Sequence, residues 1–309
     1  SPTEFSGQYA KNRKVTGEKP ELSKHFQFES MMSMTGSNAD DRFTHKPSET
    51  GAVAAAILGA LNGTAASFAD KKLNDGIKLA ADNLKAAGGN ALVVCGSNDV
   101  NIQVIVNAIN EAIGANGKTI NWAMTSNYKN GVDADMVQLV ADMNSGAVGA
   151  VLIHDVNPAY SYSDAKKFKD GLAKVVGVSF NGTMDETTEL CKYILPSHHW
   201  LESWGDAEPK TGHFCLQQPT VNPLFKTRPF QTSLLKWAGS TMDYEAYFKD
   251  FWTKKLGTAE AFHAALQSGL IETADTVGGA TFSSAKLAEA ASKVATAKQG
   301  FEVVLYQKV

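Results

Sequence analysis

The sequence predicts an α/β protein with a Rossmann-like, doubly wound parallel sheet, and three observations lead to this fold class. Short runs that are almost wholly apolar recur along the middle of the chain, as in ALVVC at 91–95 and VGAVLI at 148–153. Stretches with helical spacing of apolar residues separate these runs. Polar residues that can cap helices stand between the two kinds of stretch. Strands that are apolar on both sides belong to a parallel sheet covered by helices on both faces.

The expected strands lie in the central part of the chain. Residues 91–95, 118–124, 148–153 and 175–180 are apolar runs, and we expect them in one parallel sheet with helices on both faces. Residues 193–195 follow as an edge strand.

The expected helices follow capping and breaking residues. Ser48 begins an Ala-rich helix that runs to about Leu61. A second helix, from about Asn74 to Ala87, ends at Gly88-Gly89. Further helices are expected, in chain order, over 102–113, 136–143, 164–172, 183–191, 244–255, 259–267 and 284–296.

These patterns divide the chain into three parts. Residues 1–47 form an irregular N-terminal segment with one short strand at 25–29, and residues 48–196 form the parallel α/β domain. Residues 197–309 hold a long packed loop, helices and a returning strand at 301–306.

Composition excludes several classes of protein. The net charge of -3 and the lack of any Lys/Arg run exclude a generally basic nucleic-acid-binding surface. The longest apolar run, 51–61, is well below the roughly 20 residues that span a bilayer, so no transmembrane helix is expected. The chain opens with SPTEF, without Met or a signal-peptide pattern, and we expect a processed or excerpted chain.

Two turns at the carboxyl ends of expected strands are candidate ligand sites. The first runs from Cys95 through Ser97 and Asn98 to Asp99, but it lacks the GxGxxG and GxxxxGK[ST] patterns that bind phosphates. An ordinary helix cap is favoured there. In the second turn, His154 and Asp155 could form an acid–base pair, although hydrogen bonding to loop backbone is favoured.

Histidine and cysteine residues supply the other candidates. His198, His199 and Glu202, with His213 further along, have an H-x-x-E spacing without the second half of a zinc motif, so hydrogen bonding is favoured over metal binding. The three cysteines form no CxxC, which excludes an iron–sulfur or zinc-ribbon motif. No GxSxG nucleophile elbow occurs, and two of the cysteines are expected to be buried small hydrophobes rather than nucleophiles. The cysteines are Cys95, Cys191 and Cys215, of which the first two are the expected buried pair.

Residues 135–230 resemble the second half of molybdopterin oxidoreductases. In that family one strand ends in an Asn-Pro turn, a later strand is followed by a Glu-Thr helix, and a further strand ends in Leu-Pro before an acidic-glycine element. The matching elements are Asn157-Pro158, Glu186-Thr187, Leu195-Pro196, and Glu202 with Gly205.

A narrower resemblance covers two longer stretches. SMTGSNADDRFTHKPSE and HHWLESWGDAEPKTGHFCLQQPTVNPLFKTRPFQTSLLKWAG are similar to the large B subunit of alternative complex III, a bacterial quinol:electron-acceptor oxidoreductase. The resemblance implies a molybdopterin-oxidoreductase-type fold without the molybdenum cofactor. It implies no catalytic, cofactor-binding or metal-binding residue in this chain.

The same resemblance implies cofactors and partners elsewhere. Iron–sulfur clusters are expected in the remainder of the subunit, and haem c in multihaem cytochrome partners. Integral membrane quinol-binding subunits are expected to hold the protein on the periplasmic side of the bacterial inner membrane. The alternative is part of an active molybdopterin enzyme similar to polysulfide reductases. In that interpretation the two turns at Ser97-Asn98 and Asn157-Pro158 line a pterin pocket.

The segment 197–232 carries much apolar surface without any period of its own. We expect it to be buried against other protein, because exposed apolar patches of that size mark contact sites. Packing on its own domain is the open alternative. The large apolar residues concerned are Trp200, Trp204, Phe214, Leu216, Leu224, Phe225 and Phe230, and Arg228 accompanies them.

Overall fold

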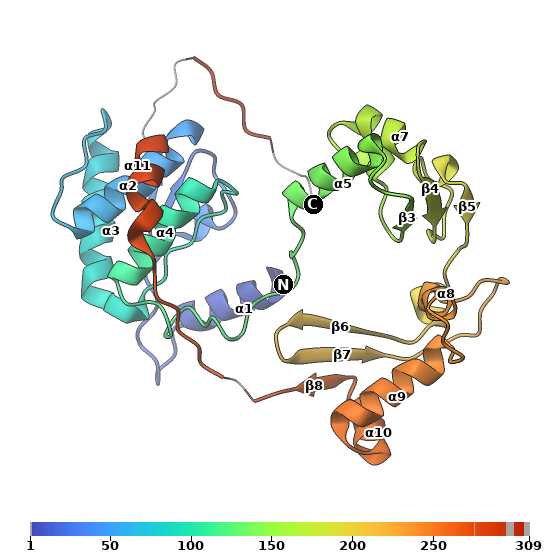
Figure 1. The fold of residues 1–309 in the computed structure, drawn as a ribbon. Coiled ribbons are helices and arrows are strands. Elements are labelled where there is room, and N and C mark those ends of the chain that lie inside the picture. Colours follow the sequence, from blue (N-terminus) through green and yellow to red (C-terminus); the bar gives the residue numbers. More distant parts are fainter. Residues whose placement is uncertain (1, 275, 295–299, 306–309) are drawn as a thin grey trace. The chain divides into compact units, whose positions relative to one another are not determined.

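The computed structural model describes residues 2–274, 276–294 and 300–305 (Figure 1). The chain packs into two compact units, one from residues 1–125 with 276–309 and the other from residues 126–275. These bounds differ from the three expected parts. Ala290 and Val294 belong to the same buried cluster as the N-terminal helices, a long-range contact that composition does not report.

The first unit is mainly helical. The wholly buried side chains of Ile77, Ile105 and Ile109 lie at the centre of its core. Two short strands pair in parallel beside these helices, with Phe28 opposite Phe43. The helices are α1 (Pro2–Arg13), α2 (Thr50–Leu61), α3 (Lys71–Ala87), α4 (Val100–Ala112) and α11 (Leu287–Lys293), and the strands are β1 (Phe26–Glu29) and β2 (Asp41–Thr44).

The second unit contains two small sheets. In the first, β3 (Ala150–Ile153), β4 (Val176–Ser179) and β5 (Tyr193–Ile194) are parallel in the order β3-β4-β5. In the second, the antiparallel order is β6-β7-β8. The remaining strands are β6 (Gly205–Lys210), β7 (His213–Gln217) and β8 (Leu270–Glu272), and the helices are α5 (Asp133–Ser145), α6 (Pro158–Ser161), α7 (Ala165–Leu172), α8 (Phe230–Trp237), α9 (Tyr244–Leu256) and α10 (Ala259–Ser268).

The expected doubly wound sheet is not formed by the described residues. Residues 148–153 and 175–180 do contain neighbouring parallel strands, and β5 is the edge strand, but 91–95 and 118–124 contain no strand. In the first of these segments, the side-chain amide of Asn110 accepts from Val93 N at 2.9 Å and donates to Val93 O at 2.8 Å. A helix side chain thus takes the backbone bonds that a neighbouring strand would take.

Helices cover one face of the parallel sheet. Ile153 packs in a core with Met143 of α5 and with Phe168 of α7. On the other face Leu152 and Val176 have exposed side chains. On the same face, however, Val178 and Phe180 are buried, and Phe180 contacts Phe230 and Trp237 of α8. In the described part of this unit, helical cover of the second face is therefore confined to the carboxyl end of the sheet.

Several smaller predictions also differ from the structure. The segment 183–191 contains a 3-10 turn at Thr188–Leu190 and no α-helix. Residues 197–232 are not one irregular loop, because they contain β6, β7 and the start of α8. Residues 301–305 form no strand, and Tyr306 lies outside the described residues.

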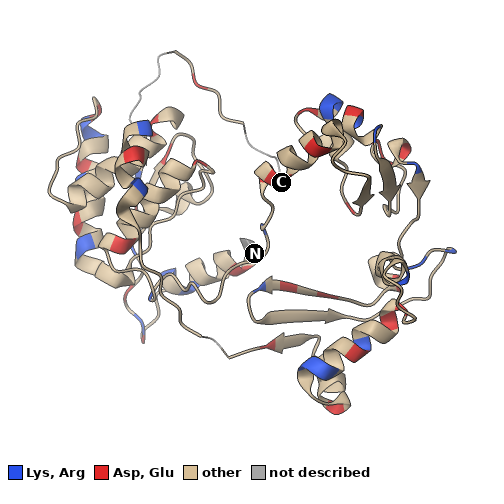
Figure 2. Ribbon diagram, in the orientation of Figure 1, with Lys and Arg blue, Asp and Glu red and all other residues tan. Residues whose placement is uncertain are grey.

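The helix surfaces carry interspersed charges of both signs (Figure 2). Pairs four residues apart are common, as between Lys78 and Asp82 on α3 at 2.6 Å. Such exposed pairs each stabilise a helix by a few tenths of a kcal/mol, about 0.3–0.5. Among the described helices, none combines the length and the apolar character that a bilayer span requires.

Candidate functional site

The carboxyl ends of β3 and β4 bring together the polar residues that follow each strand. Asn157, after β3, accepts a hydrogen bond from Thr187 Oγ1 at 2.7 Å, and its amide nitrogen donates to Glu186 at 2.6 Å. Thr187 Oγ1 also accepts from Ala159 N at 2.9 Å. Thr187 is fully buried and Pro158 is buried beside it. The Asn-Pro and Glu-Thr motifs, 29 residues apart from Asn157 to Glu186, thus form one hydrogen-bonded junction.

A second set of polar side chains lies next to this junction. Ser179, the last residue of β4, shares a 2.8 Å hydrogen bond with Thr188, and both are buried. Asn181 donates to Asp185 at 2.8 Å and to Val156 O at 3.1 Å. Burial alone would raise the pKa of Asp185, but hydrogen bonds from Thr188, Asn181 and Thr187 together lower it. The Asp185 carboxylate therefore stays charged and organises the turn.

One buried acceptor in this set has no partner among the described residues. Asn181 is 5% exposed, and its Oδ1 makes no hydrogen bond. A buried amide oxygen of this kind is normally satisfied by an ordered water or another donor. This buried oxygen could accept a hydrogen bond from a ligand.

His154 and Asp155 do not form a close acid–base pair. Their Nδ1 and Oδ2 atoms are 3.7 Å apart, and Asp155 has a φ of +52°, a left-handed conformation that is uncommon for residues other than Gly. The His154 ring instead faces Phe230 of α8, with ring centroids 3.9 Å apart. Phe230 also packs near Phe180, at 5.8 Å, so α8 covers this end of the sheet.

The turn at Ser97-Asn98 is a helix cap. Asp99 accepts a hydrogen bond from Asn101 N at 2.7 Å and caps α4, and Ser97 Oγ accepts from Asp99 N at 3.1 Å. Both residues of the turn belong to the first unit, whereas Asn157 and Pro158 belong to the second.

The histidine cluster is held by hydrogen bonds, as expected. His199 Nδ1 accepts from Leu201 N at 3.3 Å and caps the turn at Trp200–Glu202. His198 bonds to Thr227 Oγ1 at 2.7 Å, and burial lowers the pKa of His198. His213 faces Glu272 across β7 and β8 at 3.3 Å. In the described part of the chain, no group of three or more His, Cys, Asp or Glu side chains is arranged to hold a metal ion.

The cysteines behave differently from one another. Cys95 and Cys191 are partly buried and pack against the two main cores, as small hydrophobes do. Burial raises the pKa of Cys191, whose Sγ donates to Thr187 O at 3.3 Å. Cys215 on β7 is exposed. A raised pKa suppresses the thiolate, which is the nucleophilic form.

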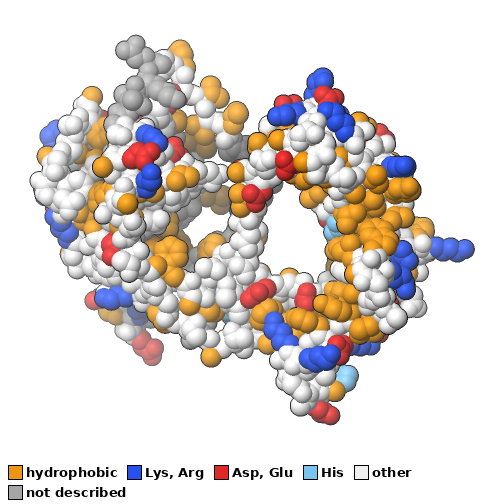
Figure 3. Space-filling view, viewed as in Figure 1, with side chains coloured by type: hydrophobic (Ala, Val, Ile, Leu, Met, Phe, Trp, Pro, Cys, Tyr) orange, Lys and Arg blue, Asp and Glu red, His pale blue; other side chains and the backbone are white. Residues whose placement is uncertain are grey.

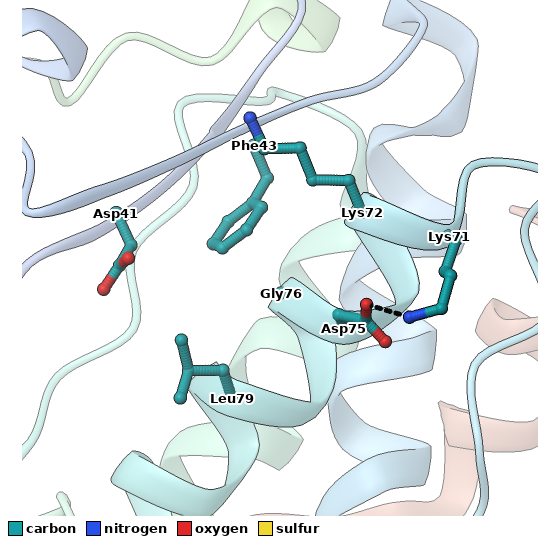
Figure 4. Close-up of a pocket in the computed structure, with 7 residues that line it drawn as sticks. All are labelled: Asp41, Phe43, Lys71, Lys72, Asp75, Gly76 and Leu79. Carbon is teal, nitrogen blue, oxygen red and sulfur yellow. Dashed lines mark hydrogen bonds and ion pairs between the residues drawn. The ribbon is translucent and has the colours of Figure 1, made fainter.

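An open cavity of about 480 Å³ lies in the first unit, between β2 and α3. Phe43 and Leu79 supply its apolar wall, and Lys71 is paired with Asp75 at its edge (Figure 4). The cavity was not predicted from the sequence, because Phe43 and Leu79 lie 36 positions apart in the chain and meet only in the folded unit. It contains no catalytic grouping.

Comparisons with known proteins find relatives of low identity over part of this chain. No family model matches the sequence. The chain is 30% identical over 151 residues to the menaquinone reductase molybdopterin-binding-like subunit of Nitratidesulfovibrio vulgaris, a match that covers 47% of this chain and 22% of that protein. It is 29% identical over 114 residues to a nitrate reductase of Symbiobacterium thermophilum, covering 36% and 15% of the two chains.

This chain contains a molybdopterin-oxidoreductase-like region. The matches span about a fifth of the length of these curated relatives or less. Among solved structures, acetylene hydratase from Pelobacter acetylenicus aligns with a TM-score of 0.47 and 12% identity, over 78% of this chain and 44% of that one. The polar junction on β3 and β4 is where the Asn-Pro and Glu-Thr motifs meet.

Proposed function

We propose that this chain is a non-catalytic, molybdopterin-oxidoreductase-like part of the iron–sulfur subunit of a respiratory quinol:electron-acceptor oxidoreductase of the alternative complex III type. It scaffolds electron transfer from quinol to a cytochrome c or an oxidase. The name of the Nitratidesulfovibrio vulgaris relative, a menaquinone reductase subunit, supports a quinone-linked complex. Iron–sulfur clusters elsewhere in the subunit, multihaem cytochrome c partners, integral membrane partners and the periplasmic side of the membrane belong to the same proposal.

The single observation that supports the non-catalytic role is the mutual hydrogen bonding of Asn157, Glu186 and Thr187 at the carboxyl end of the parallel sheet. In open α/β sheets this end is the usual ligand crevice. Here the amide oxygen of Asn157 accepts from Thr187 and its amide nitrogen donates to Glu186, and the ring of Phe230 packs against that of His154. These side chains are thus engaged with one another.

The second candidate function is part of an active molybdopterin-dependent oxidoreductase similar to polysulfide reductases. The unpartnered Oδ1 of Asn181 favours it, because a pterin carries N–H donors that this atom could accept. The Asn157-Pro158 turn does not fit a pterin contact, since its polar atoms are engaged and Pro158 is buried.

Metal and pterin analysis separates the two functions. The full-length protein would be purified from its native membranes, and molybdenum, tungsten and iron measured by mass spectrometry. Oxidised pterin would be measured by fluorescence. We expect iron, with molybdenum, tungsten and pterin far below one equivalent per subunit. A stoichiometric content of molybdenum or tungsten together with pterin would establish the active enzyme instead.

A further inference from the structure

A group of apolar side chains projects from the second unit beside the loop that joins β7 to α8. Trp200, Val221, Leu224 and Phe225 are 62%, 47%, 78% and 76% exposed, and we call these four residues the apolar tip. The other large apolar residues of 197–232 behave differently: Trp204, Phe214 and Leu216 pack on the core around Trp252. Packing on its own domain therefore applies to these three residues, and burial of the four exposed residues against other protein stays a prediction.

The apolar tip is held in place by hydrogen bonds to a neighbouring turn. Thr220 N and Val221 N donate to Leu201 O at 2.8 and 3.2 Å, and Leu224 N donates to the Glu202 carboxylate at 3.0 Å. The side-chain amide of Gln217 donates to Trp200 O. The tip is thus presented in one arrangement, which lowers the entropy lost when a partner binds it.

The chain segment that carries most of the tip is basic, whereas the neighbouring Glu202 carboxylate accepts hydrogen bonds from Leu224 N and His199 N. Residues 209–242 contain no Asp or Glu, although the whole chain has a net charge of -3. The basic residues of this run are Lys210, Lys226, Arg228 and Lys236. Lys226 is exposed directly beside Phe225, and the loop leading into α8 is marked only in blue in Figure 2. Hydrophobic side chains also gather over β5 and α8 with Lys and Arg beside them (Figure 3).

We propose that the apolar tip docks into an apolar pocket of a partner protein whose rim is lined by Asp and Glu. Trp and Arg, which are enriched where binding energy concentrates, stand here beside Leu and Phe. Opposite charges around the pocket would steer the approach and set the register. This inference rests on the proposed function and assigns the surface through which the chain joins its complex.

A protein pocket suits the tip better than a lipid bilayer does. The tip has no regular secondary structure around Val221, Leu224 and Phe225, and only some of its backbone groups form hydrogen bonds, to the turn at Trp200–Glu202. Backbone groups of a non-helical segment find no partners in hydrocarbon, whereas a protein can offer donors and acceptors to them. The neutral amides of Gln218 and Asn222, both exposed, are also available for such bonds.

The test uses the full-length subunit expressed in its native host, with three variants. Leu224→Asp combined with Phe225→Asp removes the apolar anchors. Val132→Asp combined with Val137→Asp makes the same change in charge at two exposed residues near and on α5 and is the matched control. Lys226→Glu reverses the flanking charge. Circular dichroism melting of each purified variant establishes that it is folded.

We expect the first double variant to reduce the fraction of subunit recovered in the intact complex at least about tenfold, as hot-spot truncations do. The control should assemble normally, and Lys226→Glu should weaken assembly more at low than at high salt. A photoreactive p-benzoylphenylalanine at position 225 should crosslink to one partner, at a peptide that contains Asp or Glu. Loss of binding to phosphatidylglycerol vesicles with unchanged assembly would overturn the proposal in favour of lipid. Normal assembly of a folded Leu224→Asp, Phe225→Asp variant would also overturn it, whatever the pterin content of the same preparation, which tests the proposed function separately.

Discussion

The ring of Phe230 packs against the ring of His154, with centroids 3.9 Å apart, and covers part of the imidazole at the carboxyl end of the parallel sheet, where the His154 side chain is 33% exposed. The two residues lie 76 positions apart in the sequence. An aromatic contact of this kind limits access to one face of the imidazole. It is one part of the case for a site whose side chains are engaged with one another.

Replacing Phe230 by Ala should expose His154. We expect diethylpyrocarbonate to modify His154 faster in Phe230→Ala than in the parent protein, as read by peptide mass spectrometry. Phe225→Ala, which alters an exposed ring in the same segment, is the control and should leave the rate unchanged. Equal rates in all three proteins would mean that the Phe230 ring does not limit access to the imidazole.

Thr187 is predicted to stabilise the polar junction through its two hydrogen bonds. Thr187→Val keeps the shape of the side chain but leaves Asn157 Oδ1 and Ala159 N without their bonds. An unsatisfied buried polar group costs about 1–3 kcal/mol, so the free energy of unfolding should fall by about that amount. Urea denaturation measures it. Thr183→Val, at an exposed position in the same turn region, should change stability little, and a similar loss there would argue against a specific role for Thr187.

Gly76 is required for the packing of Phe43. A Cβ at Gly76 would lie 2.4 Å from Cδ1 and Cε1 of the Phe43 ring, closer than any real contact. Gly76→Ala should therefore destabilise the first unit by about 1–3 kcal/mol, despite the better helix propensity of Ala. Gly59→Ala in α2 is the matched control: its Cβ would meet Thr64 at an ordinary 3.5 Å, and stability should hold or rise. Thermal unfolding distinguishes the two, and an increase in stability for Gly76→Ala would contradict this packing.

Lys255 stabilises the second unit through aromatic faces. Its ammonium lies 3.9 Å from the ring centroid of Phe214 and 4.8 Å from that of Trp252. Lys255→Gln should lower the free energy of unfolding by about 0.5–2 kcal/mol, the range of cation–π contacts. The neighbouring Lys254→Gln breaks only an exposed pair with Asp250 and should cost under about 0.5 kcal/mol. Equal costs would remove the cation–π explanation.

Glu29 gives the first unit a pH dependence of defined sign. Burial would raise the pKa of Glu29, but hydrogen bonds from Ser33, Arg42 and Gln27 together lower it. Because the folded pKa is depressed, the stabilisation is complete above the ordinary carboxyl pKa of about 4.3 and is lost as pH falls through the lower folded value. We expect Glu29→Gln to be less stable at pH 7 and to lose less stability on acidification. Parallel stability curves from pH 7 to 3 for the two proteins would refute this role.

Local signals in the chain were sufficient for most helices and for part of the sheet. Asp99 caps α4 in the turn where the sequence indicated a helix cap, because a cap depends on atoms within one turn. The apolar runs at 148–153 and 175–180 contain neighbouring parallel strands, as their composition predicted. His199 accepts a hydrogen bond from Leu201 N, a contact with loop backbone of the kind that the sequence favoured.

Long-range packing determined the remaining strands and contacts, because the residues next to a backbone group in the sequence do not reveal its hydrogen-bond partner. Residues 91–95 have the composition of a buried strand, but the amide of Asn110 takes the hydrogen bonds of Val93. The sequence pattern did not predict the antiparallel strands β6 and β7, because their polar and apolar residues do not alternate regularly. The joining of Asn157 to Thr187 and the packing of Phe230 against His154 required the folded chain, since contacts over 30 and 76 residues depend on how whole elements pack.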